Sequence, residues 1–485
     1  MKFIYTISVR KYFSLFFLTL ATLGAQAQSA MSNPYSRFGI GIIDPPGSVN
    51  HFAMGGVSSV VADPNNINLY NPASYATLGR TTLQLGGKGV FQTISSDTES
   101  ETYRSGQVSE VAFAFKKSNS PWGFVIGVTP YSTVGYNITS SSVINDSTST
   151  INRYDGSGGF NRLVIGGARS FRLYKKVPYD NSLVGSAKVL RDQRVREVND
   201  SLYLVSPKLS VGFNVNYFFG NIRNERRVQF NSTRFYGTKE TAKLTVFDFD
   251  IDAGLQYLMP LSLKWDQRKI KSGVYLTAGL NYLAGTKLKA RYEESAEMYL
   301  FSNQIETEVD TTFSLPTQTG TFDLPQRISG GLGLFILGTE GKVITINTEY
   351  RIQDWSNFSS SFTNAFSSSG LDRFQHIGLG FEITPKGTEE ANNIFERTTY
   401  RFGVRQTDSY LRINDIQVQQ QAVSAGFSVP IMSSKSASRF NLGVEYATGG
   451  STENNLLREE LIHLHIGFTL TPHFLNPWFV ERKYD

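Results

Sequence analysis

The stretch Phe247-Asp-Phe-Asp-Ile-Asp-Ala-Gly-Leu-Gln-Tyr257 decides the fold, because apolar and polar residues alternate along it with a period of two. Successive side chains of a β-strand point to opposite faces. One face of this strand is apolar throughout, and the other carries Asp248, Asp250 and Asp252. Such a strand requires an apolar environment on one side and water or polar partners on the other.

The length of the alternating segments distinguishes a membrane barrel from a soluble sandwich, since both alternate in this way. The segments run about 10 to 14 residues, whereas soluble strands average about 5 or 6 and an oblique bilayer crossing requires about 9 to 11. Fourteen candidates are found, an even number, as closed antiparallel bacterial barrels have. They are 81–93, 109–117, 121–131, 158–171, 208–220, 243–257, 271–284, 325–337, 342–353, 373–385, 397–407, 421–430, 438–447 and 460–471. The sequence therefore predicts an all-β transmembrane antiparallel β-barrel over residues 80–471.

Connection lengths should alternate between long outside loops and short inside turns. The outside connections are predicted at 94–108, 132–157, 221–242, 285–324, 354–372, 408–420 and 448–459. The loop at 285–324 carries six acidic residues and is expected to be a solvated acidic surface; they are Glu293, Glu294, Glu297, Glu306, Glu308 and Asp310. Aromatic residues near strand ends fit the girdles of such barrels; examples are Trp122, Tyr131, Tyr257, Tyr282, Tyr350 and Trp355.

One inside connection, 172–207, is anomalously long and basic. It is either a periplasmic excursion or a segment that hides two further strands, and we favour the excursion. Its positive charge makes it a candidate docking site for a partner protein. The candidate residues are Lys175, Lys176, Lys188, Arg191, Arg194 and Arg196.

Residues 1–27 have the features of a secretory signal peptide: Arg10 and Lys11 precede an apolar run, and Ala25-Gln-Ala27 fits a cleavage site. An N-terminal anchor helix is the alternative. The absence of cysteine among 485 residues excludes a lipoprotein anchor, a disulfide and a thiolate metal site. Removal of this segment lowers the net charge from +6 to +3, too little to indicate nucleic acid. With the barrel pattern, this predicts the cell outer membrane, and therefore outer-membrane lipid as a partner.

Residues 28–79, ahead of the first strand, are rich in Gly and Pro and do not alternate. Irregular backbone at membrane depth requires protein or water around it, and a barrel of about fourteen strands has a lumen that wall side chains alone do not fill. We therefore expect an N-terminal hatch inside the lumen, with a periplasmic tail as the alternative. Six residues form the hatch motif: Gly55, Gly56, Asp63, Asn71, Pro72 and Ala73.

This motif, directly ahead of the first strand, resembles the hatch of the long-chain fatty acid transporter (FadL-type) family. Later segments are also similar, among them Asn216-Tyr-Phe-Phe-Gly220 and Glu349-Tyr350 with Asp354-Trp-Ser356. The resemblance implies a fourteen-stranded barrel with a lumenal hatch and lateral passage of hydrophobic molecules. The family also includes the barrel subunit of type IX secretion machinery, and the tail 472–485, ending Trp478-Phe-Val-Glu-Arg-Lys-Tyr-Asp485, resembles outer-membrane proteins of bacteria that possess it.

Polar residues in the strands favour a lumen lining over a catalytic site. Asp248, Asp250 and Asp252 are lumenal polar candidates, and because like charges repel we expect arginine partners such as Arg351, Arg401 or Arg405. His463 and His465 share one face of the last strand and are interpreted as lumenal fillers. No pattern indicates a nucleophile, a metal site or a cofactor.

The sequence leaves two functions open. The first is an outer-membrane channel for passive passage of hydrophobic small molecules, with a hydrophobic ligand as partner. The alternative is a structural or interaction subunit of an outer-membrane protein-export assembly, type IX secretion-like, with a periplasmic or secretion-machinery protein as partner. The sequence does not identify the ligand.

Overall fold

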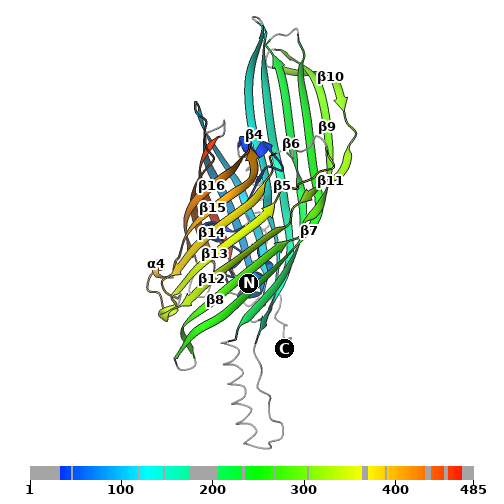
Figure 1. Cartoon of the computed structure of the whole chain (residues 1–485). Coiled ribbons are helices and arrows are strands. Elements are labelled where there is room, and N and C mark those ends of the chain that lie inside the picture. The colour runs from blue at the N-terminus through cyan, green and yellow to red at the C-terminus, as the bar shows by residue number, and fades with distance from the viewer. Residues whose placement is uncertain are drawn as a thin grey trace, which may run out of the picture.

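The computed structural model of the 485-residue chain describes residues 33–44, 47–117, 120–145, 148–173, 206–231, 235–266, 269–302, 305–362, 370–387, 390–431, 438–452 and 457–471. Fourteen of the strands in these ranges form a barrel (Figure 1). They are β2 (Thr82–Ser95), β3 (Ser100–Phe115), β4 (Trp122–Asn145), β5 (Thr148–Arg172), β6 (Lys208–Phe230), β7 (Gly237–Asp266), β8 (Lys269–Leu283), β12 (Arg327–Leu337), β13 (Val343–Asp354), β14 (Arg373–Thr384), β15 (Thr399–Ile413), β16 (Ile416–Pro430), β17 (Arg439–Gly449) and β18 (Arg458–Leu470).

Antiparallel pairing between β18 and β2 closes the ring, so the predicted all-β barrel of fourteen strands is confirmed. Each of the fourteen predicted segments corresponds to one barrel strand. Arg172 at the end of β5 pairs directly with Lys208 at the start of β6. Residues 174–205, on which the choice between a periplasmic excursion and two further strands depends, lie outside the described residues.

The apolar side chains of β7 face outward and its aspartates face inward, as the sequence indicates. Phe249 and Ile251 are 57 % and 56 % exposed on the outer face, whereas Asp250 and Asp252 are buried on the inner face. Nearer the start of the strand the pattern inverts: Leu244 and Val246 are buried inside. This inversion marks the edge of the bilayer, because beyond it the outer face contacts water while the inner face packs against protein.

The barrel has one high side, which we call the extracellular wall. It consists of the upper parts of β4 to β7 together with β9 (Thr286–Ser302), β10 (Ile305–Ser314) and β11 (Gln318–Leu324), and it rises above the other strands (Figure 1). β9 continues the sheet by pairing with the upper third of β7, from Gly237 to Val246. We assign this end to the cell exterior, because the longest connections of such barrels lie there.

Five of the predicted outside loops are mostly strand in the structure. The connections at 94–108, 132–157, 221–242, 285–324 and 408–420 were expected to be loops, and most of their residues lie in strands. The acidic residues Glu293 and Glu297, expected in a solvated loop, lie on β9 and form ion pairs with Lys243 and Lys239 of β7 at 3.7 and 3.6 Å. The apolar-polar alternation is lost there because neither face contacts lipid.

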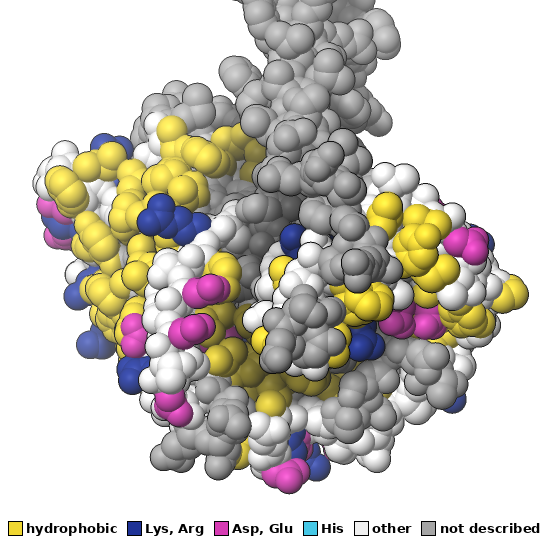
Figure 2. Space-filling view, turned by 90° about the horizontal axis from the view of Figure 1, so that it is seen from above, with side chains coloured by type: hydrophobic (Ala, Val, Ile, Leu, Met, Phe, Trp, Pro, Cys, Tyr) yellow, Lys and Arg dark blue, Asp and Glu magenta, His cyan; other side chains and the backbone are white. Residues whose placement is uncertain are grey.

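Hydrophobic side chains gather on the outer flank of the molecule when it is viewed from the extracellular end (Figure 2). Trp122, Tyr282 and Tyr350 are exposed, as the girdle prediction requires. Tyr131 and Trp355 are instead buried, at 4 % and 0 % exposure, in an apolar cluster inside the wall. Their assignment to the girdle is therefore wrong, because they point to the interior side of their backbone.

The N-terminal segment, residues 33–79, contains only short elements. They are η1 (Pro34–Arg37), β1 (Ile42–Ile43), α2 (Val49–Phe52) and η2 (Pro72–Thr77). Short helices also occur in two inside connections, η3 (Thr339–Gly341) and α4 (Ile394–Arg397). None of the helices in the described ranges is sufficiently long and apolar to cross a membrane.

Candidate functional site

Contacts around the whole circumference place the N-terminal segment within the ring of strands. β1 pairs with β4 through Ile42 and Thr133. On other sides, Gln256 of β7 donates to the Ser59 carbonyl at 3.1 Å, Arg401 of β15 donates to Asn50 at 3.1 Å, and Thr469 of β18 donates to Asn66 at 2.8 Å. A segment that contacts opposite strands in this way has the barrel on all sides.

Gly55 and Gly56 make a tight turn against the barrel strands. Both have positive φ, +66° and +75°, which only glycine adopts freely. A Cβ atom at Gly55 would lie 2.5 Å from the carbonyl oxygen of Val404 on β15. On the same strand, a Cβ at Gly403 would lie 2.1 Å from the Gly55 nitrogen. The turn and the strand therefore fit together only because both sides lack a side chain.

Glu349 on β13 fixes the residues that follow this turn. Its Oε2 accepts hydrogen bonds from the backbone N–H groups of Ser58 and Ser59, each at 2.6 Å. Its Oε1 accepts from Arg351 at 2.5 Å, and Arg351 also donates to the Gly56 carbonyl at 3.2 Å. The two charged side chains are 0 % and 1 % exposed. This buried pair is expensive to break, because either partner alone would leave an uncompensated charge.

Tyr70 of the N-terminal segment lies against two guanidinium groups. The Cζ atoms of Arg327 and Arg351 are each 4.5 Å from the centre of its ring. Tyr70 is 1 % exposed. Contacts between a desolvated cation and an aromatic face contribute about 2 kcal/mol or more, so the two arginines hold the segment at a second point.

The remaining motif residues also support the segment. Asp63 accepts from the Asn65 backbone N–H at 2.8 Å and lies 3.8 Å from Arg401 of β15. Asn71 donates to the Ser59 carbonyl at 2.5 Å and caps η2 by accepting from Ala73 at 3.1 Å. Pro72 occupies the first turn of η2, where its missing N–H costs nothing.

Asp250 and Asp252 form part of a buried polar cluster on β6 and β7. Asn216 donates to Asp250 at 2.6 Å and to Asp252 at 2.9 Å, and Asn214 donates to Asp252 at 2.9 Å. Arg162, which is 3 % exposed, interacts electrostatically with both carboxylates, as does Arg327. These are not the expected partners of the aspartates.

Asp248 and the expected arginines serve other contacts. Asp248 accepts from the backbone N–H of Lys289 on β9 at 2.9 Å, at the height where β7 changes partner from β8 to β9. Arg351 pairs with Glu349, Arg401 pairs with Glu382 at 2.6 Å, and Arg405 pairs with Glu445 at 2.8 Å. The lumenal arginines are therefore neutralised by glutamates that the sequence pattern did not single out.

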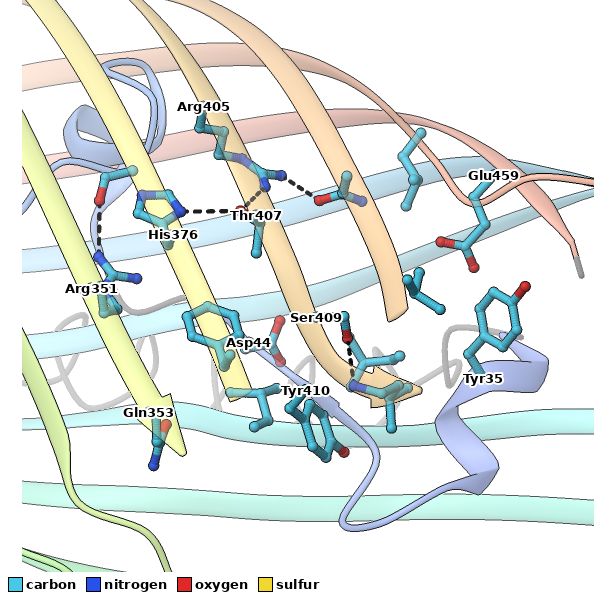
Figure 3. A pocket seen from close by; sticks show the side chains of 18 of the residues that line it. Tyr35, Asp44, Arg351, Gln353, His376, Arg405, Thr407, Ser409, Tyr410 and Glu459 are labelled. Carbon is cyan, nitrogen blue, oxygen red and sulfur yellow. Dashed lines mark hydrogen bonds between the residues drawn. The ribbon is translucent and has the colours of Figure 1, made fainter. Parts of the chain in front are cut away.

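A cavity of about 150 Å³ lies between the N-terminal segment and β13 to β18 (Figure 3). Ile42, Phe52, Phe374 and Tyr410 are among its apolar lining residues. Its polar lining is held within the protein, since Lys88 pairs with Asp44 at 2.8 Å and Arg405 donates to Thr407 at 3.0 Å. The volume is about that of a cavity that holds one benzene molecule.

Three of the described histidines, His51, His463 and His465, make structural contacts. His463 contacts Glu445 at 2.9 Å, and His465 stacks on Phe52 with ring centres 4.2 Å apart. In α2, burial lowers the pKa of the His51 imidazole to about 4, and its Nδ1 accepts from the Ser48 backbone N–H at 3.0 Å. No group of three or more potential metal ligands occurs within the ranges the structure describes.

Sequence reasoning missed Glu349, Arg351 and Tyr70 as the main contacts between segment and barrel. The signal available was the inward position of charged residues on β13, which alternate with apolar ones. The docking candidates lie outside the described residues; they are Lys175, Lys176, Lys188, Arg191, Arg194 and Arg196.

A family model described as BamG matches residues 9–177 and 200–485. The chain belongs to the BamG family. No curated protein matches it at a significant level.

By structure this BamG-family chain has the fourteen-stranded barrel fold of FadL-type proteins, as the sequence resemblance indicated. The Ralstonia pickettii toluene transporter TbuX has a TM-score of 0.51 at 12 % identity, with 88 % of this chain and 99 % of that chain covered. The Pseudomonas putida toluene transporter TodX has 0.49 at 13 %, covering 89 % and 99 %. A Pseudomonas aeruginosa FadL homologue has 0.47 at 11 %, covering 89 % and 99 %. At such identities the likeness concerns the fold alone.

Proposed function

We propose that this protein is an interaction subunit of an outer-membrane protein assembly, held in the membrane by its barrel and contacting partners through the extracellular wall. The wall carries this proposal. β7 has 30 residues, whereas β12 has 11 and still crosses the membrane. A strand needs only about 9 to 11 residues to cross, so the additional length of β4 to β7 serves a purpose outside the bilayer.

The inner face of the wall has the composition of a recognition surface. A hollow of about 480 Å³ there is lined by Tyr136, Tyr154 and Tyr292 with several charged residues. The Arg37 guanidinium lies 5.1 Å from the ring centre of Tyr154. Tyrosine and arginine are enriched in protein interfaces, and aromatic anchors of this kind often dominate binding energy.

The filled lumen also favours interaction over transport. Below the hollow, an apolar cluster joins the wall to the N-terminal segment through Ile40, Phe160, Phe218, Phe322 and Trp355, each 0 or 1 % exposed. Together with the Glu349–Arg351 pair, this packing leaves the described cavity too small for a long acyl chain. The BamG family name supports an assembly-related role.

Removal of the β9 to β11 extension tests the proposal. Leu283 of β8 and Arg327 of β12 are paired, so a two-residue turn can join them directly in place of the extension. The shortened protein should still give a heat-modifiable barrel band but should lose its co-purifying proteins in mild detergent. Full retention of those proteins would remove the wall as the basis of the proposal.

The basic segment at 172–207 is a second proposed contact, on the periplasmic side, as in a type IX secretion-like assembly. Because Arg172 pairs with Lys208, an Asn-Gly turn can replace the segment without changing the barrel. If the segment docks a periplasmic partner, the replacement should abolish that partner's co-purification. Binding through exposed charges should also weaken with salt, since charges are screened beyond about 8 Å at physiological ionic strength.

A channel for hydrophobic small molecules is the second candidate, favoured by a separation in the barrel wall. β3 and β4 pair only from Val111–Val128 to Phe115–Phe124, and above this level the two strands part. TbuX and TodX, which share the fold, are toluene transporters. Toluene uptake by cells with and without the protein tests this candidate: faster uptake with the protein supports it, and equal uptake argues against it.

A further inference from the structure

We propose that the upper edge of β4, residues 137–145, binds an uncharged extended segment of a partner polypeptide by β-strand addition; this inference rests on the proposed function and identifies where contact occurs. Above Val128, β4 pairs on one side with β5 throughout. On its other side it has left β3. The strand therefore presents one row of backbone N–H and C=O groups toward the gap.

The lower part of this edge already accepts an added strand. β1 of the N-terminal segment pairs with Ser132 and Thr133. Next along the edge, Asn33 donates to the Gly135 carbonyl at 2.7 Å, and the Gly135 N–H donates to the Ser36 hydroxyl at 3.0 Å. The edge thus has the geometry for strand addition, and the N-terminal segment uses only its lower part.

The upper part of the edge makes no such contacts with the part of the chain that the structure describes. Because N–H and C=O groups alternate sides along a strand, those of residues 137, 139, 141 and 143 point the same way as those of Gly135. Among the residues that the structure describes, none forms a backbone hydrogen bond with them on that side. Val143 and Ile144 are 79 % and 59 % exposed.

The upper edge of β4 also lacks the residues that normally protect an open edge. The run Asn137-Ile-Thr-Ser-Ser-Ser-Val-Ile-Asn145 contains no ionisable residue and no proline, and four of its residues are β-branched. Proteins normally protect open edges with charges, proline or very short strands. The β10 edge follows this rule with Glu308 and Asp310, and the upper part of β3 follows it with Glu101 and Arg104.

The contrast between the uncharged edge of β4 and the charged edges of β3 and β10 indicates which kind of segment binds to β4. A neutral edge imposes no penalty on a neutral strand, whereas a charged strand would find no opposite charge here. Main-chain hydrogen bonds would supply affinity, and contacts with Val143 and Ile144 would supply specificity. A segment of about seven to nine residues would cover the edge at about 3.4 Å per residue. Because the wall projects outside the bilayer, this segment belongs to a partner at the cell surface.

Hydrogen exchange on the full-length protein provides the first test. The protein is purified once in mild detergent with its assembly and once dissociated from it. The amides of Thr139, Ser141 and Val143 should exchange at least tenfold more slowly in the assembly, with no change in the outer-edge amides of β10. Equal exchange in both samples would overturn the inference.

A variant pair tests the same edge in cells. Thr139→Pro with Ser141→Pro removes two outward N–H groups without touching the β5 pairing, since proline is tolerated at an edge. The amount of partner that co-purifies should fall at least tenfold, whereas the heat-modifiable barrel band should be unchanged. The control Thr139→Val with Ser141→Val keeps both N–H groups and should retain the partner. Retention by the proline variant would overturn the inference and leave the proposed function standing, whereas a wild-type protein without any partner would overturn both.

A photo-crosslinker at position 143 identifies the occupant. The expected adduct joins this position to one uncharged segment of a single partner protein, and the proline variant should abolish it. An adduct with residues that precede Asn33, or with a second copy of this chain, would show a different occupant and overturn the proposal.

Discussion

The carboxylate of Glu349 on β13 accepts a hydrogen bond from the backbone N–H of Ser58 at 2.6 Å, from a strand of the barrel to the N-terminal segment. Both residues are buried. A charge at this depth is stable only if it is paired and hydrogen-bonded, and Arg351 supplies the paired charge. The position of the segment therefore depends on an ion pair within one barrel strand.

Replacing Glu349 with glutamine should release the N-terminal segment. Arg351 would keep its charge in a buried site without its partner, a change that typically costs about 3–5 kcal/mol. We expect the purified variant to show frequent opening events in planar bilayers and the wild-type protein to show none. Glu308→Gln, on exposed β10, is the control and should leave conductance unchanged. A silent Glu349→Gln protein would contradict this role.

Gly403→Val should displace the same segment by steric conflict. A Cβ at this position would lie 2.1 Å from the Gly55 nitrogen, which is backbone and has no room to move. Since the chain has no cysteine, an isosteric Ser74→Cys reporter allows the labelling rate to be measured with a maleimide. The rate should rise at least tenfold. Gly330→Val, whose nearest neighbour is at 3.8 Å, is the matched control and should not change it.

Acid should loosen the segment through His51. Burial lowers the pKa of its imidazole to about 4, whereas an undocked histidine titrates near 6.5. The undocked state therefore binds more protons between these values, so the stabilisation is complete above about pH 6.5 and is lost as the pH falls toward 4. The loss amounts to at most about 3 kcal/mol. Opening events should increase over this range, and a His51→Gln variant should show a weaker pH dependence. If the His51→Gln variant keeps the full pH dependence, groups other than His51 cause the opening at low pH.

Phe249→Arg should block membrane assembly, because an arginine on the lipid face near the midplane costs roughly 2–4 kcal/mol. The neighbour Asp250 points inward, and Asp250→Asn keeps an oxygen that accepts from Asn216. The asparagine variant should therefore appear in the outer membrane at the normal level. The intensity of the heat-modifiable band measures the amount of each variant in the outer membrane. Equal levels of the two variants would show that the assignment of outward and inward side chains in β7 is wrong.

The sequence was sufficient for the barrel within the bilayer and insufficient above it. Alternation located each barrel strand because lipid on one side and a polar interior on the other impose a period of two. In β7 the apolar positions change from odd to even numbers at Val246, where the outer face meets water and the inner face meets the apolar cluster. A pattern that inverts within one strand looks like a strand end, so the sequence predicts loops where the wall stands.

For the contacts between the N-terminal segment and the barrel, the sequence predicted the residues of the segment but not their partners on the strands. Gly55 and Asn71 belong to a recognisable motif, because tight turns and caps restrict residue type locally. Their partners Gly403 and Leu255 lie far along the chain, and nothing local marks them. The same applies to Tyr70, whose contact with Arg327 depends on the register of the whole barrel.

The mass of the native particle tests the central claim most directly. The full-length protein, tagged at its natural level of expression, is extracted from its own outer membrane in mild detergent and its mass is measured. An interaction subunit should occur in a particle well above the 54.0 kDa of the chain, with other proteins in fixed ratio. A particle that contains the barrel alone, together with protein-dependent toluene uptake by the cells, would contradict the account and favour the channel.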